Sequence, residues 1–367
     1  MRGRAAFTRR AVPPRQGDGA GSSPRHQLLR ARCARHGGHD ASMDSGRDNG
    51  WREQIREASA AVAQGATAQL YRSVSAGAVV RIAPGVFLPS EVWQRLGPDD
   101  RFRARIDAAA LRFAGEGPFS HLSAAVIWGL PGLAPWPDRV EVLADRDSGG
   151  RSRRGIVRHA VGVPDRCEVI DGHRVTSLAR TVVDAASILS FAGGVAMADF
   201  VMREARRGES GVAAARASHD ALHEAVAERA TPRGSARATR AITFADGRSG
   251  SPGESLSRCS MLASGLPAPV LQARFEDAAG LIGFVDFWWP EWQIIGEFDG
   301  VGKYLRDELR SGRSAAEVVV DEKVREDRLR AATGARVVRW GWDVARSPHA
   351  LAATLLRAGL PRRRRFS

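Results

Sequence analysis

Two short apolar segments, each with a carboxylate inside it, constrain this chain most. The first reads Val285-Asp286-Phe287-Trp288-Trp289-Pro290, and the second reads Ile294-Ile295-Gly296-Glu297-Phe298-Asp299-Gly300. Apolar runs of this length, joined by a tight connection, predict neighbouring strands of a buried sheet. An uncompensated charge inside such a run is costly. Asp286 and Glu297 are therefore candidate metal ligands, and the alternative is that they are strand-end residues facing water.

Strand geometry brings the acidic side chains of this region together. Because side chains alternate along a strand, Glu297 and Asp299 share one face, and Asp286 on the next strand can meet them. Hard oxygen ligands of this kind select Mg²⁺ or Mn²⁺. A metal held there would polarise a phosphoryl oxygen and lower the pKa of an attacking water. The pattern therefore indicates phosphodiester cleavage.

The segments around these strands predict a third folded region with the order helix, strand, strand, strand, helix, strand, helix. Pro252 and Gly253 open its first helix, which carries Glu254. An acid in the first turn of a helix is also favoured by the helix dipole alone. The other predicted elements are strands at 270–276, 283–289 and 293–299, a helix at 316–333, a strand at 336–342 and a helix at 348–358.

The element order, together with Glu297-Phe298-Asp299-Gly300, Arg325-Glu326-Asp327-Arg328 and Val337-Val338-Arg339-Trp340, resembles the PD-(D/E)XK nuclease superfamily. The very-short-patch-repair-type endonucleases are the most similar branch, over about residues 251–360. The resemblance implies a metal-dependent DNA endonuclease domain in which Asp286 and Glu297 hold the metal, Glu254 supports the site and Asp299 binds metal or positions water. We predict nucleic-acid contacts in this region from Lys323, Arg325, Arg328 and Arg339.

The family pattern places a lysine two residues after the glutamate, and this chain has Asp299 there. Lys303 and Lys323 are the only lysines in the sequence, and both follow Glu297. An ammonium is a compact point charge that approaches a water or a phosphate differently from a guanidinium. We favour Lys303 as the residue that stabilises charge at the scissile phosphate. Lys323 could instead form a surface pair with Asp327.

The region 51–98 predicts a small winged-helix-like domain. Helices are expected at 51–63 and 67–76, followed by a strand pair at 79–88 with Pro84-Gly85 as its turn. In such a domain the second helix would read DNA and Arg81 would lie on the wing. A small docking subdomain has the same pattern and remains the alternative.

The region 99–205 predicts a mixed α/β fold. Its segments Ser120-His121-Leu122-Ser123-Ala124-Ala125, Trp128-Gly129-Leu130-Pro131 and Val175-Thr176-Ser177-Leu178-Ala179-Arg180-Thr181-Val182-Val183-Asp184 resemble the AbiEi-type antitoxin family. With the winged-helix-like start, the resemblance covers about 51–205 and implies DNA binding and a cognate toxin partner. We interpret His121 as a cap or core residue rather than a ligand or base, Ser177 as an N-cap, and Arg180 with Asp184 as an ion pair.

The net charge of +14 lies largely in the tails of the 367-residue chain. Residues 1–42 contain nine Arg and two Asp, and Arg362 to Arg365 add four positive charges. Residues 1–50 therefore predict a disordered basic tail, with Met43 as a candidate true start, and 361–367 a second basic tail. Residues 206–250 are rich in Ala, Arg, Gly and Ser and predict a helix and a linker, with 231–251 as the linker.

Three scattered cysteines, Cys33, Cys167 and Cys259, show no disulfide or zinc spacing and fit a reducing cytoplasm. The longest apolar run, 185–198, is too short to span a bilayer and predicts a core helix. The sequence thus predicts a multidomain α/β protein of the cytoplasm with DNA as its partner and no membrane association. It is either a Mg²⁺- or Mn²⁺-dependent endonuclease or a non-catalytic regulator on a degenerate nuclease fold, and an enzyme acting on RNA stays open.

Overall fold

The computed structural model describes residues 50–113, 115, 117–148, 152, 155–207, 218–229, 231–300 and 315–362. The chain divides into two units, residues 1–48 and residues 49–367. The predicted basic tail and Met43 lie outside the described residues. The second unit mixes helices with several small sheets, so the predicted mixed α/β class is confirmed. Among the described helices, none has the length and apolar character needed to cross a membrane.

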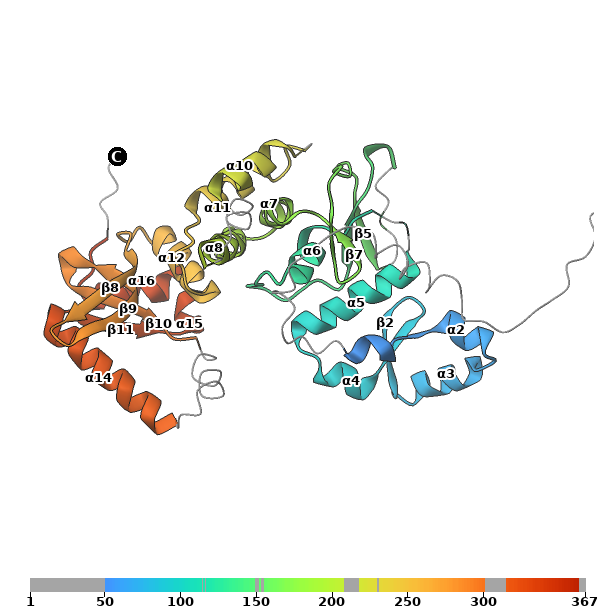
Figure 1. The fold of residues 1–367 in the computed structure, drawn as a ribbon, viewed down its shortest axis with the longest axis horizontal. Helices are drawn as coiled ribbons and strands as arrows, with labels where there is room; N and C mark the ends of the chain where they lie inside the picture. The colour runs from blue at the N-terminus through green and yellow to red at the C-terminus, as the bar shows by residue number, and fades with distance from the viewer. Residues whose placement is uncertain are drawn as a thin grey trace, which may run out of the picture. The chain divides into compact units, whose positions relative to one another are not determined.

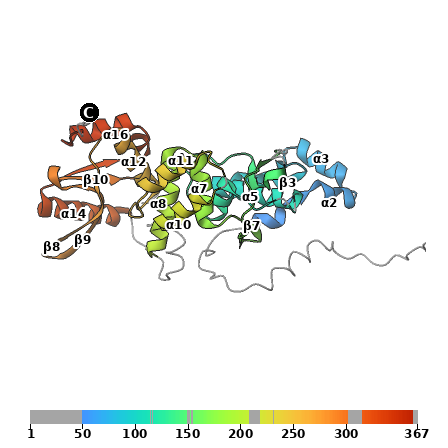
Figure 2. The same cartoon turned by 90° about the horizontal axis from the view of Figure 1, so that it is seen from above.

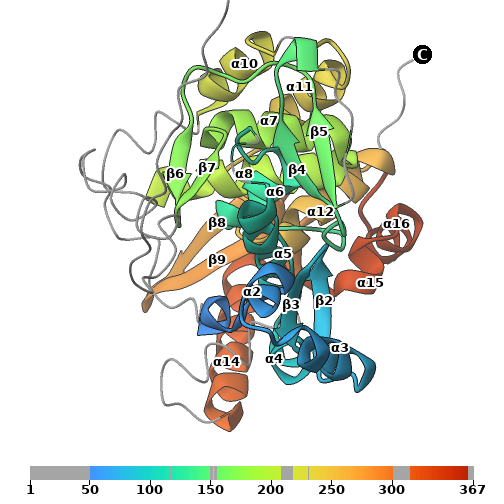
Figure 3. The same cartoon turned by 90° about the vertical axis from the view of Figure 1, so that its right-hand side faces the viewer.

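The first part of the second unit holds a three-stranded sheet with the order β1-β3-β2. Figure 3 shows β2 and β3 of this sheet side by side. The predicted single helix over 51–63 is wrong, because β1 pairs with β3 and interrupts it. Trp51 instead lies in a 3-10 helix and packs in one core with Val86, Leu88 and residues of the helix Pro98–Arg112. The elements are η3 Gly50–Gln54, β1 Arg56–Glu57, α2 Ala58–Ala63, α3 Thr67–Ser75, β2 Val79–Ala83, β3 Val86–Pro89, α4 Ser90–Arg95 and α5 Pro98–Arg112.

The middle part surrounds a pair of parallel strands, β4 Val140–Leu143 and β5 Ile156–His159. The helix α6 His121–Ile127 packs on β4 and α5, and β6 Glu168–Ile170 pairs antiparallel with β7 His173–Val175. Phe119 bridges the two strand pairs through Val142 and Val175. The core under α5 and α6 is formed by buried side chains that include Phe102, Ile106, Val126 and Ile156.

Four helices follow and share one apolar core: α7 Leu178–Ile188, α8 Phe191–Arg207, α10 His219–Ala227 and α11 Ser235–Phe244. The apolar run 185–198 is therefore not one helix. It breaks after Ile188, where Ser190 Oγ accepts a hydrogen bond from Gly193 N and caps α8. The predicted linker over 231–251 is also wrong at Ser235–Phe244, where α11 buries Ala238, Ala241 and Ile242.

The last part follows the predicted order of helices and strands. It contains α12 Pro252–Ala263, β8 Val270–Asp277, β9 Gly280–Trp289, η5 Pro290–Trp292, β10 Ile294–Phe298, α14 Ala315–Thr333, β11 Arg336–Trp340, α15 Trp342–Ala345 and α16 Pro348–Arg357. The sheet order is β11-β10-β9-β8, and β10 and β11 are parallel.

Helices cover both faces of this sheet (Figures 1 and 2). On one face Ile295 and Val285 pack with Leu329 of α14. On the other face Ile294, Phe287 and Trp340 pack with Met261 of α12 and with side chains of α15 and α16. The two acidic strands are therefore held rigidly between two cores.

Candidate functional site

Strands β9 and β10 separate at Asp286. Their antiparallel pairing runs from Ile294 opposite Trp289 to Gly296 opposite Phe287 and ends there. The next contact is made by a side chain, because Phe298 N donates to Asp286 Oδ2 at 2.8 Å. The buried Asp286 carboxylate therefore accepts the hydrogen bond that a backbone carbonyl would accept in a continuous sheet ladder. This contact fixes Asp286 at the point where the strands diverge.

Gln272 of β8 connects Asp286 to the first helix of the region. Its amide Nε2 donates to Asp286 Oδ1 at 3.1 Å and to Glu254 Oε2 at 3.0 Å. Its neighbours Leu271 and Ala273 pair regularly with β9, whereas Gln272 itself has a left-handed φ of 49°. Such a conformation is uncommon for a residue other than glycine and is kept only where its surroundings hold it. The amide thus bridges two predicted site acids.

Glu254 is almost fully buried, with 1% of its surface exposed. Ser251 caps α12 by accepting from Glu254 N, and its hydroxyl donates back to Glu254 Oε1 at 2.9 Å. Gly250 N donates to Glu254 Oε2 at 2.6 Å. This reciprocal arrangement resembles a capping box, so Glu254 stabilises the start of α12 and also faces the site through Gln272.

Glu297 lies on β10 and faces α14. Burial, and then repulsion by the Asp286 carboxylate, raise the pKa of Glu297 to about 7, although Arg325 acts in the opposite direction. Arg325 Nη2 donates to Glu297 Oε1 at 3.1 Å. Hydrogen bonds to Glu322 raise the pKa of Arg325, so this guanidinium is a permanent cation beside the site. Two buried, mutually repelling carboxylates are a donor set that suits a hard divalent cation.

Asp299 follows two residues after Glu297 and is far more exposed, with 43% of its side chain accessible. Its carboxylate lies 3.8 Å from Arg339 Nη1. The predicted catalytic Lys303 lies outside the described residues. Lys323 is exposed on α14, and Asp327 forms its ion pair with Arg330 at 3.6 Å. The structure therefore joins Glu254 and Asp286 through Gln272, places Glu297 close enough to Asp286 for their carboxylates to repel each other, and leaves Asp299 more exposed.

The predicted nucleic-acid-binding arginines of this region make ion pairs within it. Arg328 contacts both oxygens of Asp277, at 2.6 and 2.8 Å. Arg339 contacts Glu322 at 2.5 Å and Glu326 at 3.2 Å. Pairing of this kind reduces the net positive charge that these side chains present to a phosphate backbone. Their nucleic-acid role stays a prediction.

The candidate DNA-reading elements of the first part are exposed. The helix α3 buries no residue, and Tyr71 is 68% exposed. Arg81 lies on β2 with its side chain in solvent, where Nε donates to Ala83 O at 3.4 Å. In the chain, α3 comes directly before the β2–β3 hairpin, and the winged-helix assignment stays a prediction.

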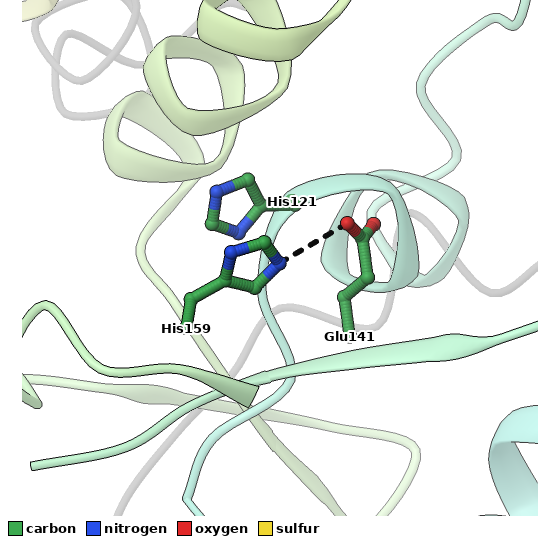
Figure 4. A group of neighbouring side chains, drawn as sticks. All are labelled: His121, Glu141 and His159. Atoms are coloured by element: carbon green, nitrogen blue, oxygen red, sulfur yellow. Dashed lines mark hydrogen bonds and ion pairs between the residues drawn. The ribbon is translucent and has the colours of Figure 1, made fainter. Parts of the chain in front are cut away.

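A second polar cluster lies in the middle part, where His121, Glu141 and His159 meet (Figure 4). The imidazole rings of His121 and His159 are stacked, with centroids 3.7 Å apart. His159 Nε2 lies 3.2 Å from Glu141 Oε1, and Leu122 N donates to Glu141 Oε2 at 2.9 Å. Burial, and then the charge of His159, lower the pKa of His121 to about 3, so its imidazole is neutral at pH 7.

An ion-pair network continues from this cluster. Arg180 Nε donates to Asp184 Oδ2 at 2.8 Å, which confirms the predicted pair, and Arg229 Nε donates to Asp184 Oδ1 at 3.1 Å. The pair is buried rather than exposed. Burial raises the pKa of Asp184, and the two guanidinium groups oppose that shift. Ser177 accepts from Arg180 N and caps α7, as predicted.

Sequence reasoning missed Gln272, Glu141 and His159. Glu141 carried the same signal as Asp286, since it is an acid inside the apolar strand Val140–Leu143. Gln272 carried no such signal, because β8 mixes apolar with polar and charged residues. His159 ends the strand next to Glu141, and only the parallel pairing of β4 with β5 brings the two side chains together.

Comparison with known proteins places this chain beside proteins whose function is not described. No protein-family model matches the sequence. Two proteins of Mycobacterium tuberculosis, from strains H37Rv and CDC 1551, are both described as uncharacterized and are 29% identical to it over 283 residues. The match covers 73% of this chain and 95% of each relative.

Proposed function

We propose that the C-terminal region of this protein is a metal-dependent endonuclease that hydrolyses DNA phosphodiester bonds. The observation that carries the proposal is the meeting of Glu254, Gln272 and Asp286 at the point where β9 and β10 separate, with Glu297 of β10 close enough for its carboxylate to be repelled by that of Asp286. The proposal is further supported by the αβββαβ order of the region and by the motifs that resemble PD-(D/E)XK nucleases of the very-short-patch-repair type.

In this proposal Asp286 and Glu297 hold Mg²⁺ or Mn²⁺, which supplies Lewis-acid polarisation of a phosphoryl oxygen and a water of lowered pKa. Asp286 keeps its orientation because Phe298 N and Gln272 hold its two oxygens. Glu254 supports the site by fixing the other hydrogen bond of Gln272. Arg325 supplies a fixed positive charge next to Glu297 and, with Lys303, is a candidate to stabilise the developing charge on the phosphate.

Nicking of supercoiled plasmid DNA tests this function. The wild-type chain should cut in Mg²⁺ or Mn²⁺ and not in EDTA. Glu297→Ala and Asp286→Asn should lower the rate by at least about 100-fold, because each removes a metal ligand. Glu276→Gln is a matched control, because Glu276 is an exposed carboxylate of the same sheet, paired with Arg274. Equal cutting by wild type and Glu297→Ala, or no cutting by wild type with either metal, would refute the proposal.

A non-catalytic regulator is the second candidate. It is favoured by the ion pair between Arg325 and Glu297, which already neutralises one site carboxylate, and by Asp299 at the usual lysine position. In this candidate function α3 and the β2–β3 hairpin bind an operator, and the region that resembles AbiEi-type antitoxins binds a cognate toxin.

Operator binding separates the two candidates. Metal-independent binding to DNA upstream of its own gene, without nicking, is expected of the regulator, and Arg81→Ala together with Arg72→Ala should weaken it. The same pair of changes should leave plasmid nicking by the C-terminal region measurable. Loss of specific binding on adding EDTA would contradict the regulator.

A further inference from the structure

We propose that His121, Glu141 and His159 form a binding site for a divalent transition-metal ion of the Zn²⁺ class. One ligand atom from each residue lies within 4.8 Å of the others, and within the described ranges no other trio of His, Cys, Asp or Glu meets that spacing. Two imidazoles and one carboxylate are ligands that zinc accepts readily and Mg²⁺ does not prefer. The site shares no residue with the proposed nuclease site and does not depend on it.

Glu141 and His159 already have the spacing of two neighbouring ligands in a coordination shell. His159 Nε2 and Glu141 Oε1 are 3.2 Å apart, and a tetrahedral zinc with bonds of about 2.0–2.1 Å separates its ligand atoms by roughly 3.3 Å. An ion can therefore replace this hydrogen bond without moving either strand. The other oxygen of Glu141 accepts from Leu122 N, and this contact orients the carboxylate as an outer-shell partner does.

The ring of His121 has to turn to complete the shell. Its plane lies 18° from that of His159, so the lone pairs of the two stacked rings do not converge on one point. Figure 4 shows one ring nitrogen of His121 on the side that faces His159 and Glu141. His121 has a left-handed φ of 49°, which is uncommon for its residue type, and strained backbone of this kind clusters at ligand sites. A rotation about the side-chain bonds brings that nitrogen toward the ion.

The access from solvent and the charges around the three residues both suit a bound metal ion. The side chain of His159 is 22% exposed and gives a route from solvent, whereas His121 and Glu141 are buried. The nearby guanidinium groups of Arg180 and Arg229 are both paired with Asp184, which offsets their repulsion of a cation. A bound ion would tie the first residue of α6 to β4 and β5 and so stabilise the middle part of the fold.

The pair formed by exposed His219 and half-buried His223 on α10 offers a competing explanation for any zinc binding. These residues are four apart on one helix face, and their ring centroids are 6.4 Å apart. The experiment therefore compares His159→Ala with His219→Ala in the full chain after chelation, with Glu297→Gln as a third variant. Zn²⁺ binding is measured by calorimetry, and the coordination by the visible absorption of the Co²⁺ complex.

The expected result is one Zn²⁺ per chain with a Co²⁺ spectrum of a four-coordinate site, and a rise of the melting temperature with Zn²⁺. His159→Ala should weaken binding by at least about tenfold, and His219→Ala and Glu297→Gln should not change it. If His159→Ala fails to fold, His159→Gln carries the same test. Wild-type binding by the His159 variants, or loss of binding in His219→Ala or Glu297→Gln, would overturn the proposal.

Discussion

At the scale of single residues, Glu297 and His121 respond to burial in opposite directions. Burial raises the pKa of the Glu297 carboxyl to about 7 and lowers that of the His121 imidazole to about 3. The folded protein therefore holds an extra proton on Glu297 at mildly acidic pH and lacks one on His121. The two groups change stability with opposite signs over overlapping pH ranges.

The pH dependence of unfolding should reveal the Glu297 contribution. Between about pH 4.5 and 7 the native state binds more protons at Glu297 than the unfolded state, so the stabilisation is complete below about pH 4.5 and is lost as pH rises through 7. Wild type should lose roughly 2–4 kcal/mol of stability relative to Glu297→Gln over this window. Urea unfolding of both proteins at several pH values measures the difference, and parallel pH profiles would contradict it.

Some site residues could be predicted from the sequence and others could not. Asp286 and Glu297 were predicted because an acid inside an apolar strand is costly, and the same signal at Glu141 was missed. Gln272 could not be assigned in this way, because its two contacts depend on a left-handed backbone conformation within β8. Arg325 was predicted to bind nucleic acid, and only the packing of α14 on the sheet shows its contact with Glu297.

At the scale of elements, the packing of α12 on the end of β10 positions the site. Gly253 lies against Phe298 so closely that an added Cβ would be 2.0 Å from the ring atom Cε1. Trp340 of β11 donates to Ser257 Oγ at 2.9 Å and fixes the same helix. The close approach of helix and strand keeps Glu254 within reach of Gln272.

Gly253→Ala should destabilise the protein. Alanine normally improves helix stability by about 0.5–1 kcal/mol over glycine, but the steric conflict with Phe298 should cost about 1–3 kcal/mol and prevail. Gly341→Ala is a matched control, because its added Cβ would meet only Asp299 O at 3.6 Å. Thermal unfolding of both variants measures the effect, and equal melting temperatures would count against this packing argument.

The elements of the C-terminal part could be predicted because turn residues separate strongly apolar strands. The helix α11 was missed, because its Ala- and Arg-rich composition resembles a linker. Alanine and arginine are nevertheless strong helix formers, and Ala238, Ala241 and Ile242 have helical spacing on the buried face. The composition of this segment suggested a linker, whereas the helical spacing of its apolar residues predicts the helix that is observed.

At the scale of the whole second unit, residues 49–367, one buried network joins the helical layer to the C-terminal sheet region. Asp199 of α8 accepts from Arg258 Nη1 at 2.9 Å and from Ser255 Oγ at 2.6 Å, both on α12. Its other oxygen accepts from Asp246 N at 2.6 Å. A charged, desolvated contact therefore joins the elements on either side of the predicted linker 231–251.

Asp199→Ala should cost about 3–5 kcal/mol, because it leaves the Arg258 guanidinium buried without its carboxylate partner. Glu204→Ala, on the same helix but at an exposed ion pair with Arg203, should change stability by no more than about 1 kcal/mol. Denaturant unfolding compares them. The double variant Asp199→Ala, Arg258→Ala should lose less than the sum of the single changes, and strict additivity would argue against a direct coupling.

The contact between Arg325 and Glu297 has a consequence for any ion that enters the proposed nuclease site. The protein carries its own counter-ion there, so the metal-free state is already partly neutralised. An incoming cation has to exchange with a tethered guanidinium, and its observed affinity is the difference between the two contacts. Such a site favours a divalent ion over a monovalent one, since only the divalent ion carries enough charge to displace the Arg325 guanidinium from Glu297.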